Sequence, residues 1–399
     1  MTSKSSDAST GEAPELALSL VRGDALFRLQ RRIGLVPAEG LGVGRRAIFF
    51  ALLTWAPIAV WAALAHRALP GTVAEPLLQH FGVHIRCLVA IPLFIVAEGV
   101  GHALTTRLIP FLATSGLVRE SDRPRLREIL RGAAHLRDST LPWVAVAALV
   151  VAWTLLSPNP AELHEVVWAD ESGPRPRMGF GGFWFLYVAR PIYAALLLGW
   201  VWRVGLLFVL FSRIAALGLQ IVPTHPDGAG GLGFLEQLCV VWSPVVLGIS
   251  SVLASRWAHE VVYHDVAVRS LRLPMLAFGG LALVLFLSPL LVWMPRLGAA
   301  KRAALLEYSA LVGRHGRLVR RRWILREPVD DSGLLAAPEI GPVADTLALY
   351  EAVRKMRALP VGRQALSAIV LPAALPMLGV VAIEVPVKEL LLKVLSTLA

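Results

Sequence analysis

Hydrophobic residues in this chain gather into long stretches, which short polar segments separate. Seven of these stretches approach the roughly 20 apolar residues that a helix needs to cross the hydrocarbon core of a bilayer. They are Ala47–Ala65, Gly82–Ala103, Leu141–Leu156, Phe183–Phe211, Leu238–Ala254, Met275–Met294 and Ala365–Ile383. The pattern predicts an all-α fold, a polytopic transmembrane helical bundle with about seven spans.

The composition narrows the class further. Hydrophobic residues make up 56% of the chain and charged residues only 17%, whereas a soluble domain has roughly 25% charged residues. The net charge of +11 would suit a protein that binds nucleic acid. However, the Lys and Arg residues lie between apolar stretches, and no recognisable nucleic-acid-binding module accompanies them. We expect the lipid bilayer as a partner and no nucleic acid. Cys87 and Cys239 lie within apolar stretches, which indicates neither a disulfide framework nor a cysteine metal site.

Lys and Arg are distributed unevenly between the two sides of the predicted membrane. If the N-terminus lies inside, 28 of them fall on the inner side and 8 on the outer side. Cytoplasmic loops carry the excess of Lys and Arg, so this count predicts a cytoplasmic N-terminus. No cleavable signal segment precedes Arg45, and the first span is expected to act as its own insertion signal.

The polar and basic segments divide the chain into five parts. These are a disordered tail (1–14), a basic amphipathic cytoplasmic helix (15–46), a transmembrane domain of six spans (47–294), a basic cytoplasmic helical domain (295–364), and a last span followed by an amphipathic helix (365–399). The transmembrane domain includes a cytoplasmic helical hairpin at 104–140 and a glycine-rich loop at 221–235. The helix near the N-terminus is expected to lie either on an anionic membrane surface or on the cytoplasmic side of the protein itself.

The last span contains Pro372 and Pro376. This predicts either a kinked helix that crosses the membrane or two half-helices that re-enter on the same side. In the second case the C-terminus returns inside.

Residues 295–364 form the one sizeable polar part. Ala299–Trp323 is an expected helix with a dense run of arginines, and Val343–Leu359 is an expected second helix. The arginines are Arg314, Arg317, Arg320, Arg321 and Arg322. Two such helices bury little core alone, so we expect them to pack on the membrane domain or on a neighbouring subunit of a homo-oligomer. The basic helices favour anionic lipid headgroups, with Trp323 as an interfacial anchor.

Ionisable residues inside the spans are the first candidates for function, because a charge at the bilayer centre costs roughly 2.5–3.5 kcal/mol. In the second span His84, Glu98 and His102 project within about 40° of one another and form one polar stripe. Arg203 in the fourth span is a natural counter-charge, and a Glu98–Arg203 pair fits in depth. The stripe predicts either a hydrated pathway or an interhelical ion pair that fixes packing. The candidate pathway residues are Arg86, Glu98, His102, Arg190 and Arg203.

Histidines gather on the predicted outer side. His80 and His84 are four residues apart, as are Glu260 and His264, and this spacing on a helix brings two ligands to one metal ion. The candidates for a divalent-metal site are His80, His84, His259, Glu260 and His264. The spacing from 259 to 264 has one residue more than the metalloprotease motif His-Glu-x-x-His. The alternative is a set of scattered interfacial histidines.

The glycine-rich loop separates two apolar stretches and has the densest set of polar residues and glycines in the chain. Its candidate residues are Thr224, His225, Asp227, Gly228, Gly230, Gly231 and Gly233. The glycines match the dinucleotide-binding spacing Gly-x-Gly-x-x-Gly in form, but membrane helices rather than a βαβ unit flank them. We expect Asp227 to cap the following turn or helix, and the loop to lie at the inner mouth of a pathway.

Four segments carry a resemblance to a known family. Pro223–Leu235, Arg322–Ile324, Ala344–Arg357 and Pro386–Leu395 are similar to parts of a family of uncharacterised bacterial multi-pass inner-membrane proteins. The similarity extends over most of the chain after the predicted tail. The resemblance implies a bacterial inner membrane, and it carries over no catalytic or binding residue because the family has no assigned activity.

Three classes of function remain. We favour a channel or transporter for an ion or small polar solute, with a polar path along the second and fourth spans. One alternative is a membrane-embedded metal-dependent enzyme that uses the outer His and Glu residues. The other is a non-catalytic sensor or scaffold that signals through its cytoplasmic helices. No Ser-His-Asp or paired-carboxylate spacing stands out, which favours a protein that is not an enzyme.

Overall fold

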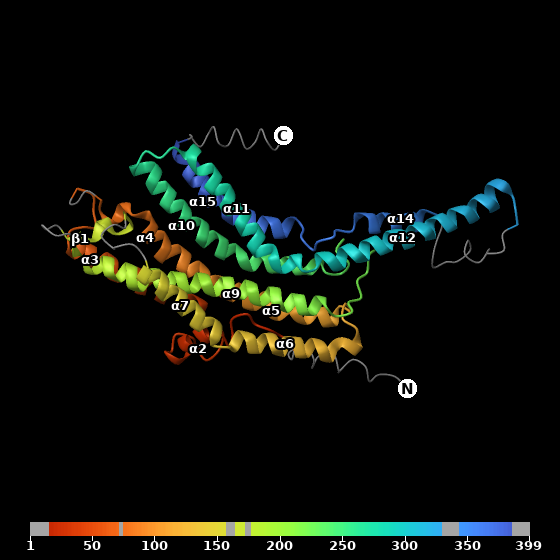
Figure 1. Cartoon of the computed structure of the whole chain (residues 1–399), viewed down its shortest axis with the longest axis horizontal. Helices are drawn as coiled ribbons and strands as arrows, with labels where there is room; N and C mark the ends of the chain where they lie inside the picture. The colour runs from red at the N-terminus through yellow and green to blue at the C-terminus, as the bar shows by residue number, and fades with distance from the viewer. Residues whose placement is uncertain (1–15, 72–74, 157–163, 172–176, 329–342, 385–399) are drawn as a thin grey trace.

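The computed structural model of the chain is built almost entirely of helices (Figure 1). It describes residues 16–71, 75–156, 164–171, 177–328 and 343–384. The predicted disordered tail and the predicted C-terminal amphipathic helix lie outside the described residues. Two strands of two residues each, β1 (Asp170–Glu171) and β2 (Arg177–Met178), pair antiparallel in one loop. The predicted all-α bundle is confirmed.

Seven helical segments in the described part of the chain are long and apolar enough to cross a membrane, and each overlaps one predicted span. The first span is α3 (Val43–Leu64), the second joins α4 (Phe81–Ile85), η2 (Arg86–Ala90) and α5 (Ile91–Thr114), and the third joins η3 (Glu120–Asp122), α6 (Arg123–Asp138) and α7 (Leu141–Leu156). The fourth joins α8 (Phe180–Trp184), η6 (Phe185–Ala189) and α9 (Arg190–Ala215), and the fifth joins η7 (Gly233–Val241) and α10 (Trp242–Tyr263). The sixth is α11 (Val268–Leu291) and the seventh is α15 (Arg363–Glu384). The remaining elements are α2 (Ala25–Arg32), η1 (Leu77–Gln79), η5 (His164–Ala169), α12 (Met294–Val319), η8 (Arg320–Leu325) and α14 (Val343–Lys355).

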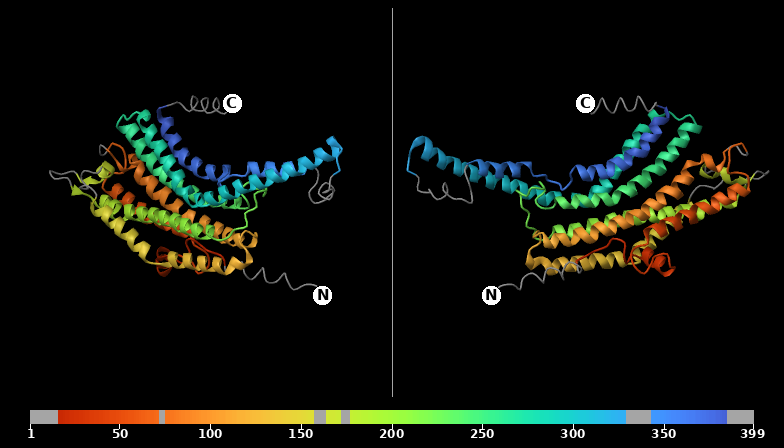
Figure 2. Two further views of the ribbon diagram at one scale, coloured as in Figure 1. Left: turned by 45° about the vertical axis from the view of Figure 1, so that its right-hand side comes forward. Right: turned by 180° about the vertical axis from the view of Figure 1, so that it is seen from behind.

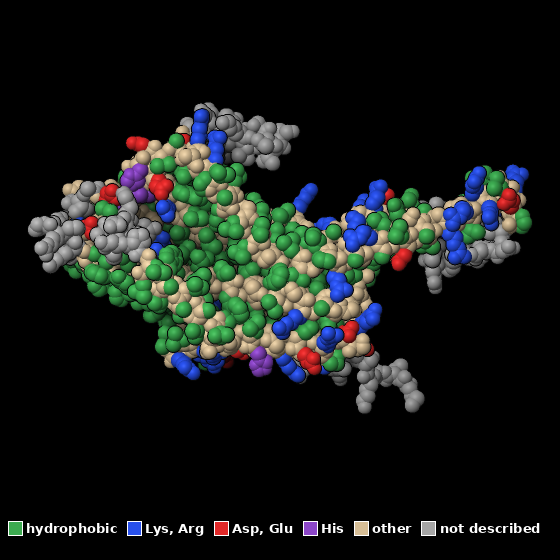
Figure 3. All heavy atoms as spheres, viewed as in Figure 1, with side chains coloured by type: hydrophobic (Ala, Val, Ile, Leu, Met, Phe, Trp, Pro, Cys, Tyr) green, Lys and Arg blue, Asp and Glu red, His purple; other side chains and the backbone are tan. Residues whose placement is uncertain are grey.

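The long helices run lengthwise, and two helices project from one end of the body that they form (Figures 1 and 2). α5 and α9 lie in the middle, with α3, α6 and α7 on one side and α10, α11 and α15 on the other. We call the end that carries α12 and α14 the arm end, and the end that carries β1 the loop end. Hydrophobic side chains cover the body, while Lys and Arg gather on the arm and along the edge formed by α2 and α6 (Figure 3).

A proline inside the first span frees a backbone carbonyl that a neighbouring helix then binds. Pro57 has no amide hydrogen to donate to the carbonyl of Leu53, four residues before it. The Trp184 indole of α8 donates to that oxygen at 3.0 Å. In lipid such a partner is needed, because no water is present to bind the freed oxygen.

The last span uses the same device and crosses the whole body. Pro372 frees the carbonyl of Ala368, and the Ser243 hydroxyl of α10 donates to it at 2.7 Å. α15 therefore continues through its prolines as one helix of 22 residues. At its end, Glu384 accepts the amide of Val268, the first residue of α11, at 2.7 Å. The segment is thus one continuous helix and not two half-helices, which favours the crossing alternative.

The second and fourth spans contain the same structural motif. In each, a five-residue α-helix leads into a five-residue π-helical segment and then into a long α-helix with proline at its second residue. The motifs begin at Phe81 and Phe180, and their prolines are Pro92 and Pro191. Proline lacks the amide hydrogen and its ring excludes the carbonyl four residues earlier, so the helix widens locally into a π-turn.

Equivalent residues of these two motifs contact each other. The Arg86 guanidinium lies 5.1 Å from the ring centre of Phe185, and the rings of Phe94 and Tyr193 are 5.5 Å apart. Each pair joins positions with the same place in the two motifs. Like-to-like contacts of this kind are those of a two-fold arrangement. The motifs of spans two and four therefore pack against each other in register.

The arm is a helical hairpin with a narrow core. α14 packs along α12, Val353 and Met356 are buried, and the Lys301 ammonium donates to the Met356 carbonyl at 2.6 Å. The base of the arm contacts the body, as expected, but Leu347 on the same predicted apolar face is exposed. Trp323 lies in η8, at the end of the arm that is farthest from the body (Figure 1).

Candidate functional site

Four charged residues from four segments meet in the interior. Asp24 is the N-cap of α2, Arg46 lies in the first turn of α3, Glu98 lies in α5 and Arg203 lies in α9. Each is at most 1% exposed. We call these four residues the buried charge cluster.

Glu98 is the centre of this cluster. Its Oε1 accepts from Arg203 Nη2 at 2.8 Å, and its Oε2 accepts from Arg46 Nη2. The same nitrogen of Arg203 donates to Asp24 Oδ2 at 2.7 Å. Asp24 Oδ1 accepts the amide of Phe27 and so caps α2. The Glu98–Arg203 pair expected from the sequence is present, together with two partners that were not expected.

The cluster is neutral when all four groups are ionised, because two carboxylates face two guanidiniums. Aromatic rings lie over both cations, with Phe27 at 5.5 Å from Arg46 and Trp200 at 4.8 Å from Arg203. Burial raises the pKa of the Asp24 carboxyl, although the neighbouring Arg203 guanidinium acts in the opposite direction. A buried, mutually paired set of this kind holds its four segments in one arrangement.

The cluster lies at one end of the membrane helices. Next to Glu98, Gly99 packs against Val43, the first residue of α3, where an added Cβ would lie 3.0 Å from Val43 Cγ2. Residues 99–114 of α5 therefore extend past the start of α3. Glu98 therefore lies level with the start of α3. This position and its burial favour the packing alternative over a hydrated path.

The other candidate pathway residues lie outside the cluster. Arg86 lies in η2, and its guanidinium faces the rings of Phe185 and Tyr193. The Arg190 guanidinium lies 4.7 Å from the ring centre of Trp153. His102 Nδ1 is 2.9 Å from the Ser19 hydroxyl oxygen. These residues contact different segments of the chain.

The glycine-rich loop folds around the carboxylate of its own aspartate. Asp227 Oδ1 accepts the amides of Ala229 at 2.8 Å and Gly231 at 3.2 Å, and Oδ2 accepts that of Gly233 at 2.8 Å. Partial burial alone would raise the pKa of Asp227, but these amides together with His225 lower it. Asp227 thus caps the turns of the loop and binds the amide of Gly233, the first residue of η7, whereas the N-cap residue Leu232 makes no side-chain cap. The amides that would bind a phosphate in a Gly-x-Gly-x-x-Gly loop are used within the loop.

This loop also attaches the arm. Gly228 and Gly230 have φ values of +61° and +65°, which favour glycine. The Arg357 amide donates to the Gly228 carbonyl at 2.7 Å, and Arg357 Nη2 donates to the Asp227 carbonyl at 2.9 Å. Thr224 lies in the turn that opens the loop. The loop is therefore a joint between the body and the base of the arm.

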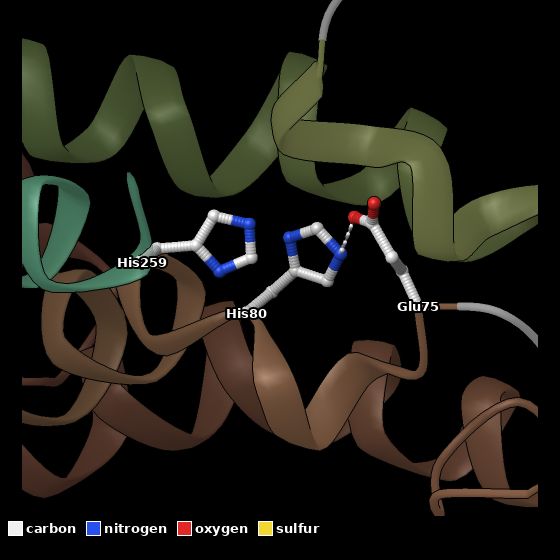
Figure 4. A group of neighbouring side chains, drawn as sticks. All are labelled: Glu75, His80 and His259. Atoms are coloured by element: carbon white, nitrogen blue, oxygen red, sulfur yellow. Dashed lines mark ion pairs between the residues drawn. The ribbon is translucent and has the colours of Figure 1, made fainter. Parts of the chain in front are cut away.

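Three residues come together at the loop end (Figure 4). One ligand-type atom each from Glu75, His80 and His259 lies within 4.8 Å of the other two. His80 Nε2 is 3.3 Å from Glu75 Oε2, and the rings of His80 and His259 stack with centres 5.0 Å apart. The ring of His264 lies 5.5 Å from that of His259. Two candidate metal ligands from the sequence are thus neighbours, joined by a glutamate that was not a candidate.

The remaining metal candidates have other partners. The Trp55 indole donates to His84 Nδ1 at 2.9 Å, so His84 Nε2 carries the hydrogen that faces the Leu77 carbonyl at 3.1 Å. Both ring nitrogens of His84 are therefore used. Glu260 accepts from Arg256 at 3.2 Å. The expected pairing of His84 with a metal-binding His80 does not form, because the helix begins after His80.

Asp24, Arg46 and Glu75 complete these sites but were not candidates in the sequence. Arg46 directly precedes the first predicted span, where a basic residue indicates orientation and not a buried pair. Asp24 precedes a helix and has the chemistry of an N-cap, a signal that predicts its position but not its distant partners. Glu75 lies in a loop whose spacing to His259 carries no pattern.

Comparison with protein-family models, with curated proteins and with solved structures gives no match. The resemblance to a family of bacterial inner-membrane proteins therefore stays a prediction. The seven apolar helices are those of an integral, multi-pass membrane protein.

Proposed function

We propose that this protein is a membrane-anchored scaffold, in which the seven-helix body holds a basic arm for an acidic protein partner on the cytoplasmic side. The observation that carries this proposal is the arm itself. α12, η8 and α14 leave the body at one end and extend well beyond it (Figures 1 and 3).

The distal part of the arm exposes apolar and basic side chains together. Trp323 and Ile324 are each 71% exposed, and Leu325 is 48% exposed. The exposed arginines beside them are Arg314, Arg317, Arg320, Arg321 and Arg322. Aromatic residues and arginine are enriched in the cores of protein interfaces. The complementary surface is an apolar patch surrounded by carboxylates.

The geometry favours a separate protein over lipid or a second copy. α12 has 26 residues, which corresponds to about 39 Å at 1.5 Å per residue. The arm leads away from the apolar body, so headgroups of the surrounding bilayer meet its base rather than its tip (Figure 3). The arm of a second copy would bring the same arginines, and like charges oppose association. The predicted homo-oligomer remains a separate prediction.

The body sets the direction of the arm. α12 begins at Met294, shortly after α11 ends at Leu291. Trp293 between them is fully buried and packs on Phe211 of α9 with ring centres 5.5 Å apart. Together with the contacts of Arg357 to the glycine-rich loop, this fixes the base of the arm at two places. A scaffold needs such a rigid base.

We place the arm and the N-terminus in the cytoplasm of a bacterial cell with an inner membrane. The excess of Lys and Arg on the arm side supports this orientation. α2 packs Phe27 inward and exposes Leu29, Ile33, Arg31 and Arg32. A helix with exposed apolar and basic residues beside a membrane domain favours contact with anionic headgroups.

The channel or transporter favoured by the sequence has less support. Glu98 and Arg203, on which that hypothesis depends, bind each other in a neutral cluster that is at most 1% exposed. It stays a prediction, and ion flux through vesicles that contain the purified protein is its test. Flux that is lost in Glu98→Gln while the variant stays folded would favour transport over the scaffold.

Site-specific crosslinking tests the scaffold. A photo-crosslinking amino acid replaces Trp323 in the full chain, expressed in a bacterial membrane. We expect one discrete adduct with a protein of acidic composition, and loss of that adduct when Arg320–Arg322 are changed to Glu. The matched control reverses Arg125 and Arg131, which are exposed on α6, and it should keep the adduct.

Other outcomes of this experiment reject the proposal. Adducts only with lipid, or only with a second copy of the chain, would show that the arm does not bind an acidic protein partner. An adduct that survives charge reversal at Arg320–Arg322 would remove the electrostatic reason for it. Expression and detergent-extracted size of each variant, compared with the parent, separate loss of binding from loss of folding.

A further inference from the structure

We infer that Glu75, His80 and His259 form a binding site for one divalent transition-metal ion, with Zn²⁺ as the best fit. Two imidazoles and one carboxylate are the donor set of zinc sites that keep a coordination position open. The site lies at the loop end, opposite the arm (Figure 1). It is therefore independent of the scaffold proposed above.

The distances suit such an ion. In a tetrahedral site with bonds of about 2.0–2.1 Å, two ligand atoms lie about 3.4 Å apart. His80 Nε2 and Glu75 Oε2 are already 3.3 Å apart. The ligand-type atom of His259 lies within 4.8 Å of both, so a small side-chain shift is enough to bring in the third ligand. Figure 4 shows the ring of His80 between the other two side chains.

The surroundings orient the third ligand. His259 Nδ1 lies 3.2 Å from the Gln79 carbonyl oxygen, which only accepts hydrogen bonds. Nδ1 therefore carries the hydrogen, and the lone pair of the neutral ring is on Nε2. Metal-binding histidines commonly donate their other ring hydrogen to a backbone carbonyl in this way. His80 is 5% exposed and Glu75 is 25% exposed, so the site has a buried side and an open side for entry.

The ion would join two spans that are distant in sequence. His80 directly precedes α4, the start of the second span, and His259 lies near the end of α10 in the fifth. An ion that binds the folded chain and not the unfolded chain stabilises the fold, by an amount that rises with the logarithm of its concentration above the Kd. We therefore expect metal to raise the unfolding temperature as well as to bind.

Metal titration of the full chain tests this inference. The purified protein in detergent is stripped with a chelator and titrated with Zn²⁺ and with Co²⁺. We expect about one ion per chain, visible absorption bands of four-coordinate Co²⁺, and a rise in unfolding temperature. His80→Gln and His259→Gln should each weaken binding by at least about tenfold. The control His225→Gln, at the arm end, should bind as the parent does.

Two results would overturn the site. One is a parent protein that binds less than about 0.1 ion per chain under these conditions. The other is unchanged Zn²⁺ affinity in both His80→Gln and His259→Gln. If a histidine variant fails to fold, Glu75→Gln replaces it, since Glu75 is the more exposed residue. That variant should keep the metal-free unfolding temperature of the parent and lose the increase caused by Zn²⁺.

Discussion

Replacement of Glu98 by glutamine tests whether the buried charge cluster holds the body together. Glutamine keeps the shape of the side chain and removes its charge, which leaves Arg46 and Arg203 with Asp24 as their one carboxylate. All four residues are at most 1% exposed, so water cannot compensate for the missing charge. We expect Glu98→Gln to lower the free energy of unfolding strongly.

The magnitude follows from the two ion pairs that Glu98 makes. Charges about 4 Å apart attract by about 4 kcal/mol at an effective dielectric constant of about 20, so the loss of the pairs with Arg46 and Arg203 removes about 8 kcal/mol. The carboxylate no longer has to be desolvated, which returns several kcal/mol. The expected net loss is about 3–5 kcal/mol, as for other buried pairs that lose one partner.

Equilibrium unfolding in mixed micelles, followed by tryptophan fluorescence, measures this loss, since Trp200 lies over the Arg203 guanidinium. The double variant Glu98→Gln/Arg46→Gln restores neutrality and should be more stable than Glu98→Gln by about 1–3 kcal/mol. Glu236→Gln is the matched control, because its pair with Arg357 is 3.9 Å long and partly exposed and is worth less than about 1 kcal/mol. A Glu98→Gln protein within about 1 kcal/mol of the parent would refute the reasoning.

Three further predictions concern the loop and the last span. The pKa of Asp227 is lowered from 3.8 in the folded state, so its contribution to stability is complete above pH 3.8 and is lost as the pH falls through the folded-state pKa. Asp227→Asn should remove this pH dependence of unfolding and cost about 1–3 kcal/mol at neutral pH. Gly230→Ala should destabilise the loop, because its Cβ would lie 2.4 Å from Ile221 Cγ2 at a φ of +65°, and faster hydrogen exchange of the loop amides would reveal it. Ser243→Ala should cost about 1 kcal/mol in the parent and less in Pro372→Ala, which restores the amide donor; equal costs in both backgrounds would contradict this account.

The sequence predicted the spans well because the thickness of a bilayer imposes one length and one chemistry on every crossing helix. It also predicted the Glu98–Arg203 pair, since a charge in an apolar stretch needs a partner. Asp24 and Arg46 escaped prediction because they lie outside the apolar stretches and reach the cluster only through tertiary packing.

Local rules succeeded where the chain contacts itself nearby. The capping role of Asp227 follows from amides at most six residues away, so its own sequence context was sufficient. The spacing of His80 and His84 failed because that rule assumes a helix through both, and α4 begins at Phe81. The partner of His80 is instead His259, which nothing in the intervening chain relates to it.

The order in which the cluster residues leave the ribosome has a consequence for biosynthesis. Asp24 and Arg46 are synthesised before any helix has been inserted, whereas Arg203 follows only in the fourth span. The ion pair between Asp24 and Arg203 therefore cannot form until the fourth span has been synthesised. Nascent chains arrested before Arg203 should leave the N-terminal segment open to protease, and chains arrested well after α9 should protect it.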